Sequence, residues 1–167
     1  RSRKEKGGDK MHDYFYHNLG QTLTLTAADG TDLNLQPTEE LAFAGAHLYA
    51  YSYLYDKKVA ATGKDVKATF TIDMKDKGGD DISMNLWMKG EPDREVFTAL
   101  SPMTEGLSRT PGMPYNIKEQ PTLTFVARQH GEAWNRPFVA VYEPSTRKEP
   151  SAIQAVSYFD AEETALF

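Results

Sequence analysis

The chain has 167 residues, 40% hydrophobic and 11% aromatic, which is enough for one domain with a substantial core. It has no cysteine, which excludes disulfides and thiolate metal sites. Residues 1–10 form a charged lead-in of local charge +3, so the rest of the chain carries −8 and the whole −5. An acidic body is a poor surface for nucleic acid, and no apolar run reaches the roughly 20 residues of a membrane span.

The stretch from His12 to Gly20 (HDYFYHNLG) concentrates histidines, an aspartate and tyrosines, as a catalytic or metal site would. Its alternating aromatic residues instead predict a β-strand. His12 and His17 would then face opposite sides, roughly 16 Å apart at about 3.3 Å per residue. Two zinc ligands each lie about 2 Å from one ion, so we expect no metal and no cofactor here.

The following segments are typical of strands and turns. Residues 22–26, the turn at Asp29-Gly30 and residues 33–35 predict a hairpin, and residues 37–41 predict a short helical turn. Residues 101–121, with four prolines and two glycines, predict a long loop, and residues 143–151 predict a turn. Further strands are predicted over 49–55, 66–74, 82–88, 96–100, 123–128, 138–142 and 153–159.

Short strands at this spacing, without repeated βαβ units, predict an all-β fold. We expect one domain over residues 1–167, an antiparallel β-sandwich of about nine strands with at most a short helical turn. No basic and apolar leader opens the chain, and a start at Arg1 indicates that the native N-terminus lies upstream.

Three groups of residues are candidates for substrate contact. A strand over residues 49–55 would place the tyrosine row Tyr49, Tyr51, Tyr53 and Tyr55 on one face, either to stack on sugar rings or to fill space between sheets. In the long loop, Arg109 could bind a carboxylate or sulfate and Tyr115 could stack, unless the loop is only a solvated connection.

The third candidate group is the turn over residues 130–136, where Trp134 and Arg136 lie close together in sequence. The alternative is that Trp134 simply covers an edge of the sandwich. The sequence has no GxSxG elbow, no phosphate loop and no HExxH spacing, so we assign no catalytic residue and no metal ligand.

Several segments together resemble the C-terminal β-sheet region of heparinase II/III-like polysaccharide lyases. The segments are His12–His17, Leu86-Trp87-Met88 through Pro102, Leu123–Arg128, Pro137–Pro144 (PFVAVYEP) and Ile153–Val156. The resemblance implies a larger enzyme in which a helical toroid precedes the β layers. Such enzymes remove the C5 proton of a uronic acid and expel the 4-linked sugar. Their catalytic groups lie mainly upstream of the region seen here, so none is transferred to this chain.

We therefore hypothesise a non-catalytic C-terminal portion of a lyase that cleaves uronic-acid polysaccharides such as glycosaminoglycans. It would pack on an upstream domain and contact the polysaccharide through the parent enzyme. The resemblance also implies a periplasmic or secreted protein. The alternatives are a carbohydrate-binding module that uses the tyrosine row, and a purely structural or interaction domain.

Overall fold

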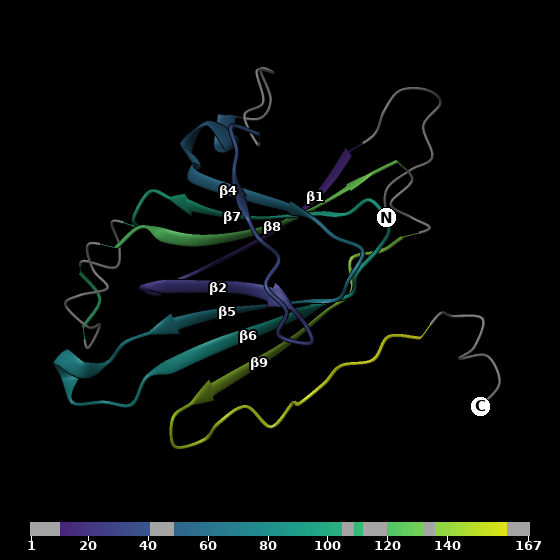
Figure 1. The fold of residues 1–167 in the computed structure, drawn as a ribbon. Coiled ribbons are helices and arrows are strands. Elements are labelled where there is room, and N and C mark those ends of the chain that lie inside the picture. Colours follow the sequence, from purple (N-terminus) through teal and green to yellow (C-terminus); the bar gives the residue numbers. More distant parts are fainter. Residues whose placement is uncertain (1–10, 41–48, 105–108, 112–119, 132–135, 160–167) are drawn as a thin grey trace.

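The computed structural model describes residues 11–40, 49–104, 109–111, 120–131 and 136–159, and these form two antiparallel sheets that face each other (Figure 1). The predicted all-β sandwich is confirmed, with nine strands among the described residues. The first sheet has the order β1 (Met11–Asn18), β8 (Thr122–His130), β7 (Glu95–Ser101), β4 (Tyr55–Ala61) and β3 (Gln36–Pro37). The second has the order β2 (Thr22–Ala27), β5 (Val66–Ile72), β6 (Ile82–Met88) and β9 (Ala140–Thr146).

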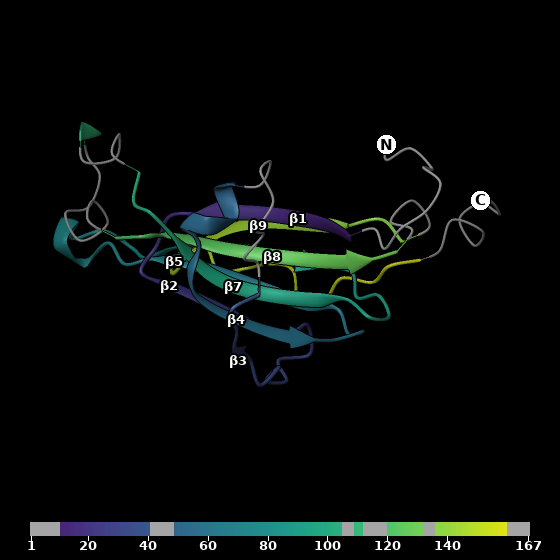
Figure 2. The ribbon, with the colours of Figure 1, turned by 90° about the horizontal axis from the view of Figure 1, so that it is seen from above.

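The helical elements of the described part include two 3₁₀ turns, η1 (Tyr49–Tyr53) and η2 (Lys75–Lys77). Neither is a candidate for a membrane span, and no other helix in the described residues is long and apolar enough to be one. Seen from above, the first sheet lies over the second, and η1 lies on its outer side (Figure 2).

The core between the sheets follows from the alternation of side chains along each strand. Val66, Ala68 and Phe70 of β5 are all at most 2% exposed, as their predicted core face requires. In β6, Leu86 and Met88 are fully buried, whereas Ile82 is 41% exposed because it belongs to the last pair of both neighbouring ladders. The buried members of this core are Leu25, Val66, Ala68, Phe70, Leu86, Met88, Val96, Leu123, Phe125 and Ala127.

The predicted strand over residues 49–55 is wrong, because residues 49–53 form the 3₁₀ turn η1 and strand β4 begins at Tyr55. The Leu54 N–H donates to the Tyr51 carbonyl at 3.1 Å. In a 3₁₀ turn, residues three apart share a face, so Tyr51 and Leu54 both pack on the first sheet while Tyr53 stays 63% exposed. A strand would have sent Tyr51 and Leu54 to opposite sides.

The predicted hairpin over residues 22–35 is only partly correct. The turn at Asp29-Gly30 forms, but β2 pairs with β5 rather than with residues 33–35, which make no strand. The predicted helical turn is also absent over residues 37–40, since Gln36–Pro37 pairs with β4 and the Thr38 N–H donates to the Lys57 carbonyl. The neighbouring strand thus satisfies backbone groups that the helical turn would have used.

The C-terminal part departs from the prediction twice. Strand β9 continues through Pro144 to Thr146, where a turn was predicted, because an edge strand leaves one side of its backbone free of ladder bonds. The predicted strand over residues 153–159 is wrong, and Ser151–Phe159 runs as an extended segment beside β9 (Figure 1). The Glu143 carboxylate holds it by accepting the Ala152 N–H at 2.7 Å, the Ile153 N–H at 2.9 Å and the Ser151 hydroxyl.

Glu143→Gln is expected to loosen the segment from Ser151 to Phe159. The hydrogen bond from Ser151, together with the two backbone N–H donors, lowers the pKa of Glu143 below its usual 4.5. A lowered pKa means that this contribution is present above about pH 4.5 and is lost as the pH falls through the folded-state value. Hydrogen exchange at Ala152 and Ile153 should therefore be faster in the variant at neutral pH.

Glu149→Gln is the matched control, because Glu149 is exposed and only its backbone makes the contacts described. Equal exchange rates in Glu143→Gln and the wild type would show that the carboxylate does not hold the segment.

Candidate functional site

The outer face of the first sheet, turned away from the second sheet, carries a small core of its own. Phe97 and Val126 lie on this face and are fully buried, although no strand of the second sheet reaches them. They are covered by residues of β1 and by the η1 region. The members of this outer cluster are Leu54, Phe97, Ala99 and Val126, with Phe15, Tyr51 and Val59 packed against them.

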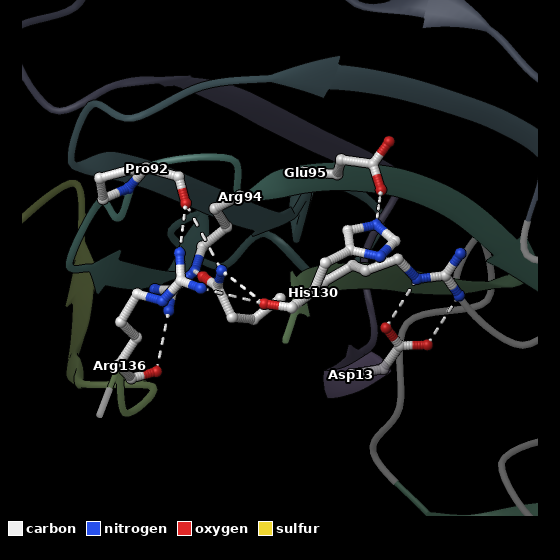
Figure 3. A network of polar contacts seen from close by, with 8 residues as sticks. Asp13, Pro92, Arg94, Glu95, His130 and Arg136 are labelled. Atoms are coloured by element: carbon white, nitrogen blue, oxygen red, sulfur yellow. Dashed lines mark hydrogen bonds and ion pairs between the residues drawn. The ribbon is translucent and has the colours of Figure 1, made fainter. Parts of the chain in front are cut away.

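An ion pair anchors the outer cluster. Asp13 of β1 lies directly opposite Arg128 of β8 in the ladder, and the guanidinium donates to both carboxylate oxygens at 2.8 Å (Figure 3). The two side chains are each 5% exposed. Tyr51 adds a third bond, from its hydroxyl to Asp13 Oδ2 at 2.7 Å. Burial, and secondly this bond to a carboxylate, raises the pKa of Tyr51 well above that of an ordinary phenol, so its hydroxyl acts as a donor.

A second polar network closes one end of the same sheet. Arg94 is 1% exposed and donates to Gln129 Oε1 at 3.2 Å and to the Lys89 carbonyl at 2.7 Å. Arg136 donates to the Pro92 and His130 carbonyls, both at 3.3 Å (Figure 3). The two arginines thereby tie the turn before β7 to the end of β8. The described contacts of the two arginines hold these turns in place and do not form an open site for an anion.

An apolar cavity of about 430 Å³ lies beside the outer cluster. Phe15 stacks on His17 with ring centroids 5.9 Å apart, and meets Tyr51 edge-on at 5.0 Å. Buried Thr124 links two of the polar groups, since its hydroxyl contacts Ser101 Oγ at 2.7 Å and His17 Nδ1 at 2.9 Å. The lining residues are Phe15, His17, Tyr51, Tyr53, Leu54 and Ser101.

The cavity can bind a ligand, but its described lining lacks the complete set of groups for β-elimination. That chemistry needs a base, an acid and a charge neutraliser converging within hydrogen-bond reach. Partial burial lowers the pKa of His17, so its imidazole is neutral at pH 7 and could accept a proton, while the protonated Tyr51 hydroxyl is engaged by Asp13. No Lys, Arg or carboxylate is among the described lining residues. The described residues also contain no cluster of three His, Cys, Asp or Glu side chains that could hold a metal.

The structure brings two of the six predicted contact residues together, because Tyr51 and Tyr53 both line the cavity. They do not share one face, since Tyr51 points into the outer cluster and Tyr53 is exposed. Arg136 is engaged with backbone carbonyls, and Arg109 is exposed. Tyr115 and Trp134 lie outside the described residues.

The sequence prediction missed Phe15, His17 and Ser101 as cavity residues. One signal was available: Phe15 and His17 are two apart in a predicted strand and therefore share a face. Ser101 gave no such signal, because its position depends on how β7 and β8 pair.

The chain is 33% identical over 153 residues to an endo-acting ulvan lyase from Formosa agariphila. The match covers 89% of this chain but 17% of the length of that relative. No family model and no solved structure matches the chain. The relation to a polysaccharide lyase that the sequence motifs predicted is thus confirmed at this coarse level.

Asp13→Asn is expected to lower the free energy of unfolding by about 3–5 kcal/mol, because it removes the charge of the carboxylate that binds the buried Arg128 guanidinium at two oxygens. The double variant Asp13→Leu with Arg128→Met should recover much of this loss, since no unpaired charge remains. Urea unfolding measures both effects.

Asp29→Asn is the control for this comparison, because the pair of Asp29 with Lys64 is exposed and its atoms are 3.9 Å apart. It should unfold like the wild type. If Asp13→Asn unfolds at the same urea concentration as Asp29→Asn, the buried pair does not anchor the outer face.

Proposed function

We propose that this chain is a non-catalytic β-sandwich portion of a longer lyase that cleaves uronic-acid polysaccharides by β-elimination. Its role is to support catalytic layers formed elsewhere in that protein. The observation that carries this proposal is the match to 17% of the length of an ulvan lyase over 89% of this chain. Ulvan is therefore the first substrate to test, and a secreted or periplasmic location fits a polysaccharide substrate.

The chemistry of the described residues supports a non-catalytic role. The phenol pKa values of Tyr16, Tyr51, Tyr142 and Tyr158 are all raised by burial, that of Tyr158 to about 12, so none is a ready phenolate base. The Arg128 guanidinium is already bound to the Asp13 carboxylate. It could neutralise a substrate carboxylate only if this buried ion pair broke.

The finer relation to heparinase II/III-like lyases rests on the sequence motifs. The segment Leu123–Arg128 forms most of β8, an inner strand of the first sheet between β1 and β7, and much of the PFVAVYEP segment forms the edge strand β9 of the second sheet. Both motifs are therefore structural strands, as a role in buttressing other layers requires. We propose this family relation on that basis.

A carbohydrate-binding module is the second candidate function, and the cavity beside η1 favours it. Its walls combine aromatic rings with the imidazole of His17 and the hydroxyl of Ser101. Sugar sites use such a combination, because aromatic faces accept C–H groups and polar atoms bind hydroxyls. The two functions are compatible, since a supporting layer can also hold substrate.

The purified chain is expected to release no unsaturated uronate from ulvan. The assay follows the absorbance of the unsaturated product over hours, with the Formosa agariphila ulvan lyase as positive control. The physical reason is the lack of a converging base, acid and neutraliser in the described residues. Rising absorbance with the chain alone, abolished by boiling it, would overturn the non-catalytic assignment.

A further inference from the structure

The cavity beside η1 differs from the rest of the surface in its charge. The chain carries a net charge of −5, yet the described lining contains no formally charged side chain at neutral pH. Behind the wall, Asp13 and Arg128 neutralise each other and are each only 5% exposed. A carboxylate or sulfate entering this cavity would lose water and find no cation in exchange.

The aromatic wall supplies a stacking surface. Tyr53 lines the cavity and is 63% exposed, and Phe15 with His17 forms a stacked pair along the wall. A pyranose ring presents a face of C–H groups that packs against aromatic rings. The volume of about 430 Å³ falls within the range of roughly 300–1,000 Å³ typical of small-ligand sites.

The imidazole of His17 supplies polarity that suits a hydroxyl. Its Nδ1 is engaged by Thr124 at 2.9 Å, so Nε2 is the ring nitrogen that remains for a ligand. Nε2 is a donor in one tautomer and an acceptor in the other. A sugar hydroxyl can donate or accept, so it suits both tautomers, whereas a carboxylate oxygen only accepts.

We propose that this cavity is a subsite for one neutral pyranose ring of a polysaccharide chain, stacked on Tyr53 and hydrogen-bonded to His17 Nε2. The subsite rests on the proposed function, since it assumes that the longer protein acts on a polysaccharide. It assigns the cavity to a neutral sugar rather than to the uronate at which the chain is cleaved. The chain would therefore hold substrate away from the reacting bond.

Calorimetric titration of the 167-residue chain tests the subsite with three probes: ulvan, carboxyl-reduced ulvan in which uronates have become neutral sugars, and alginate, which consists of uronates. We expect the reduced ulvan to bind at least as tightly as ulvan, and alginate to bind much more weakly. Tyr53→Ala should weaken binding of reduced ulvan roughly two- to tenfold, the range expected from losing one aromatic contact.

Tyr55→Ala is the matched control, because Tyr55 is two residues away, 48% exposed and not part of the cavity wall. The affinity of the Tyr55→Ala variant for reduced ulvan should equal that of the wild type. Equal losses in both variants, preference for alginate, or no binding of any probe would overturn the subsite. None of these results touches the proposed supporting role, which fails only if the chain itself forms unsaturated product.

Discussion

The bidentate ion pair between Asp13 and Arg128 is the constraint on which the outer face of the first sheet depends. It joins β1 to β8 at a directly opposed pair, far apart in sequence. The same carboxylate accepts the Tyr51 hydroxyl, which draws the η1 turn onto the sheet. With Tyr51 in place, Leu54 packs on the same side and buries Phe97. One buried carboxylate thus organises both the outer cluster and the wall of the cavity beside it.

The hydrogen bonds of Asp13 limit the chemistry that the outer face can perform. A carboxylate that holds an arginine and a tyrosine is not available as a base, and the tyrosine it binds is kept protonated. Arg94 and Arg136 likewise donate their described hydrogen bonds to side-chain and backbone oxygens near the ends of β7 and β8. What the outer face leaves open is a neutral, aromatic cavity. Such a site is suited to holding a sugar ring, and under the proposed function bond cleavage falls to another part of a longer protein.

The strands could be predicted from sequence wherever the pattern is local. Val66–Ile72 alternates cleanly, so its core face was predicted correctly. The η1 turn was not, because the acceptor that fixes Tyr51 is Asp13, 38 residues earlier. The end of the chain was mispredicted for a similar reason. The segment after Ser151 alternates like a strand, but it is held by the Glu143 carboxylate rather than by a ladder.

In the candidate site, too, single residues could be predicted from sequence but their arrangement could not. Tyr51 and Tyr53 could be singled out from sequence, although for a strand face that does not exist. The cavity itself needs β1, β7 and the η1 region to meet, and no local pattern encodes that meeting. The predicted relation to a polysaccharide lyase did not depend on the cavity, since that prediction drew on strand motifs spread along the chain.

Deuterium wash-in tests the central claim most directly. A polysaccharide lyase begins by removing the C5 proton of a uronate, so a chain with a working base would exchange that proton even where no bond is broken. Ulvan incubated with this chain in D₂O should show no deuterium at C5 by NMR, as in a sample without protein. Incorporation at C5 that depends on the chain would contradict the account, because it would require a base and a charge neutraliser acting together, and the described lining of the cavity holds no such neutraliser.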